Sequence, residues 1–269
     1  MKATKDVECV ISVAGISKLS SIIYLYNHSL ILGMKPPRLT KISDLWRHPS
    51  YDLSHPYNVN FIGTKNIVDA CKLNNVRKVI RLTGALTGKP ATLPFVILFN
   101  LLLSFSPKWH ERSEKYIRQS GLNYTCVRPT ELKSIEPASE TNRNLILIQG
   151  DSDKRPPIPG KISINDVSDL CILSAIDPYN KFDYSSVVCS STVRTDNSEN
   201  YKDWITLSNE LELQDYKPLE EQPHTKIALL SGLMITVSLT ALLRVAFNLL
   251  AMLFRVLLGW QKVLNYALF

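Results

Sequence analysis

A long stretch without charge near one end of the chain sets the strongest limit on its fold. Ile227 to Leu243 is a run of 17 residues with no charged side chain, and after Arg244 residues 245–254 are apolar again. A run of this length is near the minimum for a helix that crosses a hydrocarbon core of about 30 Å. The alternative is a helix buried in a soluble core, but so long an apolar segment is hard to cover in a chain of 269 residues. The run therefore predicts a membrane helix, so a globular fold must come from the residues before it.

The arginine inside this segment is compatible with a span. The side chain of Arg244 would lie near one end of the helix, where its long stem lets the charge reach the lipid headgroups. Trp260 and Tyr266 are residue types that favour the interface between lipid and water. We predict a single-pass anchor within residues 226–269, with membrane lipid as its partner. The sequence does not say which membrane this is.

The charge balance argues against nucleic-acid binding. The net charge is +7, but residues 226–269 hold four basic and no acidic residues, which leaves 27 basic against 24 acidic residues in the first 225. No run rich in lysine or arginine is present, so we predict no nucleic-acid partner. The five cysteines stand singly, without a CxxC pair or spaced histidines, so neither a metal site nor a disulfide framework is predicted.

Composition divides the chain into three parts. Residues 196–225 are polar and acidic, as in a linker, and they separate the apolar end from the rest. We therefore expect a domain over residues 1–195, a linker over 196–225 and an anchor over 226–269.

Strands and helices alternate in the first part. Short runs of β-branched and apolar residues predict strands, and they lie at residues 7–13, 79–82, 124–127 and 187–189. Helices are expected between them, at residues 57–73, 109–120 and after Ser163. Gly121 is a typical residue after a helix end, and Ser163 with Asp166 is typical of a helix start. Because no hairpin signal separates the strands, the pattern predicts an α/β fold with a parallel sheet.

Small and polar residues follow three of these strands. They are Ala14-Gly15, Thr83-Gly84 and Arg128-Pro129-Thr130. In an open parallel sheet, ligands bind beyond the carboxyl ends of the strands. We therefore expect these residues to gather at one edge of the sheet and to include the ligand contacts. A second apolar run, Leu93–Phe105, is too short for a span and fits a buried helix or an interfacial segment.

Three sequence blocks resemble a known family. They are VNFIGTKNIVDACKLNNVRKVIRLTG (59–84), SEKYIRQSGLNYTCVRPTEL (113–132) and ISINDVSDLCILSAIDP (162–178). Together they resemble the NmrA-like, atypical branch of the short-chain dehydrogenases over about residues 3–190. The resemblance implies a Rossmann-like domain that binds NAD or NADP. It also implies the cofactor contacts, which are Ala14, Gly15, Asn60, Thr83, Gly84, Arg128, Pro129 and Thr130.

The glycine-rich part of that family's pattern is missing. The strand at residues 7–13 corresponds to the family's fourth strand, and the 10 glycines form no G-x-x-G-x-x-G motif. That turn holds the cofactor's pyrophosphate through backbone N–H groups. Either the sequence is N-terminally truncated, which we favour, or it is a degenerate member. In both cases we expect an incomplete Rossmann-like domain whose NAD(P) affinity is weak.

The family's catalytic pair is also replaced. Its Tyr-x-x-x-Lys motif supplies an acid/base tyrosine and a lysine that lowers the tyrosine's pKa. Counting back from Glu114, His110 stands at the lysine position and Ser106 at the tyrosine position. We take His110 and the nearby Lys108 as the catalytic candidates, and we expect Tyr116 to be a core aromatic.

Two main functions compete on these grounds. The first is a membrane-anchored NAD(P)-dependent oxidoreductase whose lipophilic substrate lies against the apolar run Leu93–Phe105. The second is a non-catalytic scaffold or regulatory protein with a protein partner. A third and less favoured hypothesis is a membrane protein that binds no ligand.

Overall fold

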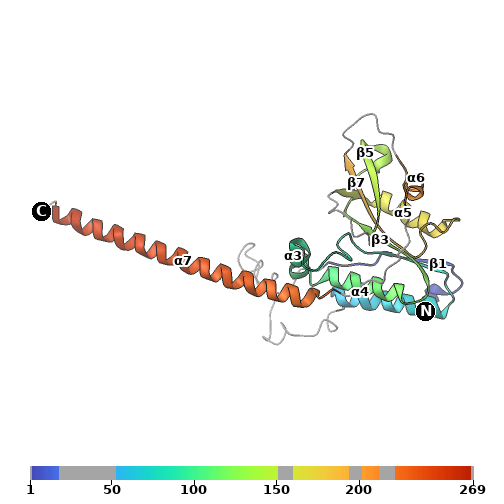
Figure 1. Cartoon of the computed structure of the whole chain (residues 1–269), viewed down its shortest axis with the longest axis horizontal. Helices are drawn as coiled ribbons and strands as arrows, with labels where there is room; N and C mark the ends of the chain where they lie inside the picture. The colour runs from blue at the N-terminus through green and yellow to red at the C-terminus, as the bar shows by residue number, and fades with distance from the viewer. Residues whose placement is uncertain (1, 18–52, 151–159, 194–201, 212–221, 268–269) are drawn as a thin grey trace. The chain divides into compact units, whose positions relative to one another are not determined.

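The computed structural model describes residues 2–17, 53–150, 160–193, 202–211 and 222–267 (Figure 1). The chain forms two compact units, residues 1–224 and residues 225–269. In chain order the elements of the first unit are η1 (Lys2–Thr4), β1 (Cys9–Ser12), η4 (Tyr57–Ile62), α2 (Gly63–Leu73), β2 (Lys78–Leu82), α3 (Pro94–Leu102), α4 (Ser106–Arg118), β3 (Asn123–Pro129), β4 (Glu131–Lys133), η5 (Ala138–Glu140), β5 (Arg143–Gln149), β6 (Lys161–Ser163), α5 (Ile164–Ile176), β7 (Ser185–Val193) and α6 (Trp204–Asn209).

The strands form one mixed sheet in the order β1-β2-β3-β7-β6-β4, with β5 also paired to β7. Strands β1, β2, β3 and β7 are parallel, as expected, and Val10 lies opposite Val79. The sheet is not wholly parallel, which corrects the sequence-based expectation, because β5 and the start of β6 run antiparallel to β7. About 35 residues separate β5 from β7, so no local turn could signal this pairing.

Helices cover both faces of the sheet, which gives three layers (Figure 1). On one face, Val68 of α2 and Ile117 of α4 pack against Cys126 of β3. On the other face, Leu170 of α5 packs against Val127 of β3. Successive residues of β3 therefore serve opposite cores, as the alternation of side chains along a strand requires.

The helix boundaries follow the sequence with two differences. The predicted helix at residues 57–73 begins with the π-helical turn η4, which buries Asn60 completely. The predicted helix at 109–120 starts earlier, at Ser106, and Gly121 after its end has a φ of +80°. That left-handed conformation explains the glycine, since a side chain would strain it.

Helix α5 begins as predicted at Ser163, whose Oγ accepts a hydrogen bond from the backbone N–H of Asn165. Among the described contacts, the Asp166 side chain does not accept a hydrogen bond from the backbone N–H of Ser163, as a capping box would require. Its carboxylate instead accepts from the backbone N–H of Ala138. Within the segment predicted as a linker, α6 contributes Trp204, which is buried in the core and donates its indole N–H to the carbonyl of Asp166 at 2.8 Å.

The helix α7 (His224–Ala267) forms the second unit from Thr225 onward. Within it, His224–Ala246 is long and apolar enough to cross a membrane, with a mean hydropathy of 1.9 and 6% of its most apolar stretch buried. By length and composition, the predicted anchor is a candidate span. The side chains of Trp260 and Tyr266 lie outside the described side chains.

Candidate functional site

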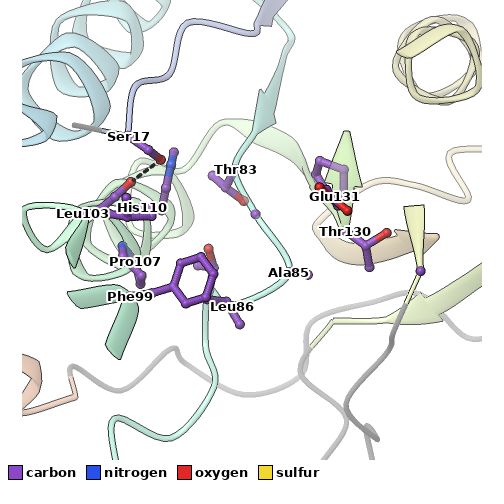
Figure 2. Close-up of a pocket in the computed structure, with 15 residues that line it drawn as sticks. Ser17, Thr83, Ala85, Leu86, Phe99, Leu103, Pro107, His110, Thr130 and Glu131 are labelled. Atoms are coloured by element: carbon purple, nitrogen blue, oxygen red, sulfur yellow. Dashed lines mark hydrogen bonds between the residues drawn. The ribbon is translucent and has the colours of Figure 1, made fainter. Parts of the chain in front are cut away.

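A cavity of about 620 Å³ opens at the carboxyl ends of the central parallel strands (Figure 2). One wall comes from the segments after β2 and β3 and includes three threonines. The opposite wall comes from α3, α4 and their connection, and it contains both apolar and polar side chains. The lining residues are Ser17, Thr83, Gly84, Ala85, Leu86, Thr87, Phe99, Leu103, Ser106, Pro107, His110, Pro129, Thr130, Glu131 and Gly160. A volume of this size matches sites for small organic ligands.

The ends of β2 and β3 are linked by the buried ion pair of Glu114 and Arg128. Thr83, directly after β2, donates its hydroxyl proton to Glu114 Oε1 of α4 at 2.6 Å. Arg128, near the end of β3, donates hydrogen bonds from its Nε and Nη2 to the same carboxylate, and the bond from Nη2 is 2.5 Å long. Its Nη1 donates to the carbonyl of Gly150. Glu114 and Arg128 have no exposed surface. Because its proton is engaged, the Thr83 hydroxyl offers a lone pair to a ligand.

Burial and the arginine act on Glu114 in opposite directions. Burial alone would raise the pKa of Glu114, but the charge and hydrogen bonds of Arg128 outweigh it and hold the pKa below its ordinary value. The carboxylate is therefore ionised at neutral pH and is a permanent acceptor for Thr83. We conclude that the pair fixes the hydroxyl of Thr83 rather than moving protons.

A second hydrogen-bond group orients His110. The side-chain amide of Asn60 is fixed by Ile16, because its Oδ1 accepts from Ile16 N–H and its Nδ2 donates to the Ile16 carbonyl, each at 2.9 Å. The same Nδ2 faces Ser106 Oγ at 3.2 Å and His110 Nε2 at 3.3 Å. The two protons of this amide serve three neighbouring atoms, and they hold the Nε2 side of the imidazole in place. The Nδ1 atom of His110 is buried and has no hydrogen-bond partner among the described residues.

His110 is neutral at physiological pH. Burial, followed by the positive charge of Arg81, lowers the pKa of His110 to about 4. Arg81 is itself buried in β2, where its Nη1 donates to Ser12 Oγ and to the carbonyls of Ser12 and Ala14. Burial lowers the pKa of Arg81 to about 10, so the guanidinium stays charged. His110 can thus donate a hydrogen bond but is a poor source of a proton at pH 7.

The residues predicted from the sequence divide into two groups. Five of them line the cavity, namely Thr83, Gly84, His110, Pro129 and Thr130. The others lie beside it. Ala14 and Gly15 are exposed residues after β1, Asn60 holds His110 from behind, and Arg128 is enclosed in its ion pair.

Lys108 does not line the cavity. Its Nζ lies over the ring of Trp109 at 4.3 Å and over the ring of Phe105 at 5.7 Å. On a helix, residues two positions apart point in different directions, which explains why Lys108 and His110 separate.

Several lining residues were not predicted. Ala85, Leu86 and Thr87 continue directly from Thr83-Gly84, so a longer reading of that strand end would have found them. Phe99 and Leu103 come from the apolar run that was expected to face a lipophilic ligand. Gly160 carries no such signal, because only the pairing of β6 with β7 brings it to the cavity.

Comparisons with known proteins agree with this geometry. Residues 2–178 match the sequence profile of a family described as NAD(P)H-binding. An uncharacterised chloroplast protein of Arabidopsis thaliana is 40% identical over 97 residues, which cover 33% of this chain and 33% of that protein. The chloroplast protein TIC 62 of Arabidopsis thaliana is 31% identical over 131 residues, which cover 49% of this chain and 19% of its own length. The matched segments span between 19% and 35% of the curated relatives' lengths.

Solved structures align with this chain at low identity. An oxidoreductase from Lactococcus lactis aligns with a TM-score of 0.45 and 12% identity, covering 78% of this chain and 70% of that one. A wide-type short-chain dehydrogenase/reductase from Veillonella parvula, in complex with NADP, aligns with a TM-score of 0.40 and 16% identity, covering 72% and 96%.

Proposed function

The chain belongs to the NAD(P)H-binding family, in its NmrA-like, short-chain-dehydrogenase-like branch, and we propose that it is a membrane-anchored oxidoreductase for a small lipophilic substrate. The cavity at the strand ends is the observation that carries the proposal. Its hydroxyl and backbone groups after β2 and β3 suit a nicotinamide, and the apolar side chains of Phe99, Leu103 and Pro107 suit a lipophilic molecule beside it.

The cofactor's nicotinamide end fits the described residues. Thr83 and Thr130 would hold its polar groups, because the Thr83 oxygen offers a lone pair and the Thr130 hydroxyl lines the same cavity. His110 lines the same cavity beside them. A bound nicotinamide would supply hydride transfer, and the protein's own contribution is to position the two ligands and exclude water.

The pyrophosphate end has no comparable seat among the described residues. No glycine-rich turn opens a helix within these residues. The fit therefore covers the nicotinamide end of the cofactor and not its phosphates.

The test is hydride transfer by the full chain in detergent micelles or vesicles. NADH and NADPH oxidation would be followed with a panel of lipophilic ketones, aldehydes and quinones. Leu86→Trp, which fills the cavity, should reduce turnover at least about tenfold, whereas Ile176→Trp on the exposed end of α5 should not. Equal turnover in the two variants would contradict the cavity as the site.

A second function is favoured by one observation. The hydroxyl proton of Thr83 is committed to Glu114, and the pKa of His110 is about 4, so neither is a ready proton donor at pH 7. A protein that binds a nicotinamide ligand without turning it over would need no such donor. Binding of reduced nicotinamide mononucleotide that Leu86→Trp abolishes, without hydride transfer to any substrate, would support this regulatory or scaffold role.

Membrane anchoring by α7 is the part of the proposal supported by the candidate span His224–Ala246. Carbonate extraction tests it directly. The full chain should remain in the membrane pellet, and a chain ending at Thr225 should be released. Release of the full chain would mean that α7 is a peripheral or core helix.

A further inference from the structure

One carboxylate supplies the charge of the cavity. Among the described residues that line it, Glu131 is the only acidic side chain, and none is a lysine or an arginine. His110 adds no charge, because its pKa of about 4 leaves the imidazole neutral at physiological pH. In Figure 2, Glu131 lies beside Thr130, with Phe99 on the other side of the view. A ligand in the cavity therefore meets a negative side chain and no positive one in this lining.

Two lysines beside Glu131 keep it ionised. Lys133 Nζ lies 2.7 Å from Glu131 Oε1, and this hydrogen bond, with the charges of Lys133 and Lys161, holds the pKa of Glu131 below its ordinary value. Lys161 lies opposite Glu131 in the pairing of β4 with β6. Neither lysine lines the cavity. The Glu131 side chain is 55% exposed, and its Oε2 has no hydrogen-bond donor among the described residues, so this oxygen is available to a ligand.

The described lining has no group that readily gives up a proton at neutral pH. Glu131 is already ionised, and the pKa of His110 is about 4. Serine and threonine hydroxyls are very weak acids, so they do not serve as general acids at neutral pH. Three lining hydroxyls also have their protons committed to neighbours, namely Thr83 to Glu114, Thr130 to Ser190 and Ser106 to the carbonyl of Ile16.

This lining disfavours the reduction of a carbonyl group. When hydride adds to a ketone or an aldehyde, the oxygen becomes an alkoxide, which needs a proton or a positive group beside it. The charge of Glu131 would instead repel the alkoxide. An iminium group makes neither demand. Its carbon accepts the hydride and its nitrogen becomes a neutral amine, so the step transfers no proton.

From these observations we infer that the substrate of this cavity is a lipophilic iminium cation, which Glu131 attracts and which is reduced to an amine. This substrate class rests on the proposed oxidoreductase function and narrows it. A bound nicotinamide in its reduced form would supply the hydride. The hydride forms a C–H bond at the iminium carbon, and the electron pair of the C=N π bond becomes the lone pair of the nitrogen. The iminium is reduced and NADH or NADPH is oxidised. The two reactants carry one positive charge before and after the step, so Glu131 compensates the same charge throughout.

The apolar side chains of the cavity suit the remainder of such a cation. Phe99, Leu103 and Pro107 line the cavity together with Leu86. Phe99 is the only phenyl ring among the described lining residues, and the face of an aromatic ring attracts an organic cation. A cyclic iminium therefore finds a counter-charge at Glu131 and apolar contacts for its carbon frame.

Binding without a cofactor tests the recognition of charge. The full chain in an uncharged detergent would be titrated with three ligands that share one bicyclic frame. They are N,N-dimethyltetrahydroisoquinolinium, a cation that cannot accept hydride, the neutral ketone α-tetralone and the anion tetralin-carboxylate. The cation should bind most tightly and the anion least. Glu131→Gln should weaken the cation about fivefold, the upper range for an exposed ion pair, and should not weaken the ketone.

Two further variants control for the charge of Glu131. Glu210→Gln is the matched control, because Glu210 is 50% exposed and pairs with Lys202 outside the cavity lining. It should leave all three affinities unchanged. Lys133→Gln should strengthen binding of the cation, because it removes the competing ammonium from Glu131. Equal affinities for the three ligands, or a cation preference that survives Glu131→Gln, would overturn the inference.

Turnover tests the reaction itself. NADH and NADPH oxidation would be followed with N-methyldihydroisoquinolinium and with α-tetralone, and the rate with Leu86→Trp would be subtracted as background. The iminium should be reduced at least about tenfold faster than the ketone, because it needs no proton. Glu131→Gln should raise the KM for the iminium about fivefold and should not raise the KM for the ketone.

The substrate class and the oxidoreductase function fail in different ways. Reduction of the ketone at the same rate as the iminium, or faster, contradicts the iminium class and leaves the oxidoreductase function standing. Failure to reduce either compound, together with a cation preference that Glu131→Gln removes, contradicts the oxidoreductase function and supports recognition of a cation by Glu131. Absence of both turnover and cation preference contradicts both.

Discussion

The buried pair of Glu114 and Arg128 combines two roles at the residue scale, because it joins α4 to β3 and fixes the Thr83 hydroxyl at the cavity. Both charges are fully removed from water, so each depends on the other. Removing one partner of such a pair leaves a buried charge without compensation, which costs far more than a surface pair would.

We expect Arg128→Met to lower the free energy of unfolding by about 3–5 kcal/mol. The control is Lys202→Met, which breaks a pair with Glu210 whose side chains are 51% and 50% exposed, and it should cost less than about 1 kcal/mol. Urea denaturation followed by circular dichroism measures both. A similar small loss in the two variants would show that Glu114 finds another partner or becomes protonated.

His110 should make stability depend on pH in the acidic range. Its pKa is about 4 in the folded protein and about 6.5 in the unfolded chain, so the unfolded chain binds more protons between these values. Stability from this group is therefore complete above pH 6.5 and is lost as the pH falls toward 4. The slope is at most about 1.4 kcal/mol per pH unit, and solvent at the partly exposed ring reduces it.

His110→Gln should flatten this part of the stability profile, while the loss due to Glu114 remains in both proteins. The measurement is the difference in unfolding free energy between wild type and variant at steps from pH 7 to pH 4. Parallel profiles would mean that the imidazole is solvated and that its pKa is not shifted.

At the scale of elements, two glycines beside the cavity serve different purposes. Gly160 has a φ of +137°, and a Cβ there would lie 2.5 Å from Ser190 Oγ and 2.8 Å from the Ser191 carbonyl. It therefore lets β6 approach β7. A Cβ at Gly84 would meet open space. The first glycine is needed for the sheet, and the second is available for a ligand.

We expect Gly160→Ala to destabilise the protein by about 1–3 kcal/mol, through overpacking and backbone strain, and Gly84→Ala to leave its stability nearly unchanged. Thermal melts of the two variants make the comparison. Ligand binding should respond in the opposite way, with Gly84→Ala weakening it. A large loss of stability at Gly84 would contradict the open space seen there.

Helix α7 offers a prediction about where a charge is tolerated. Arg244 lies nine residues from the middle of the charge-free run, about 13.5 Å along the axis, which places it near the headgroups of a spanning helix. Val237 lies near the middle. Val237→Arg should oppose insertion by about 2.5–3.5 kcal/mol, whereas Arg244→Leu should favour it slightly. A translocon insertion assay of this segment compares them, and equal insertion of both would argue against a span.

At the scale of the whole molecule, the proposed nicotinamide seat has no matching pyrophosphate seat among the described residues. We therefore expect the full chain in detergent to bind NAD and NADP more weakly than micromolar in isothermal titration. Nicotinamide mononucleotide should compete for the cavity, and adenosine monophosphate should not. Micromolar binding of either dinucleotide would show that another feature replaces the glycine-rich turn.

The sequence predicted the elements that depend on local patterns. Strands β1, β2, β3 and β7 lie where β-branched runs placed them, and α5 begins at Ser163, because burial period and caps are properties of neighbouring residues. It missed the pairing of β5, which depends on residues about 40 positions away. The sequence also could not indicate Gly160 as a cavity residue, because its position depends on the pairing of β6 with the distant strand β7.

The sequence by itself determined the family, the positions of the strands whose ends line the site and the candidate anchor, since motifs and uninterrupted hydropathy are read along the chain. Only the tertiary structure decided which side chains face the cavity. It enclosed Arg128 with Glu114, turned Lys108 onto Trp109 and left His110 neutral, with Asn60 against its Nε2. These outcomes depend on side-chain direction, burial and the charges of distant neighbours, and those quantities exist only once the layers have packed.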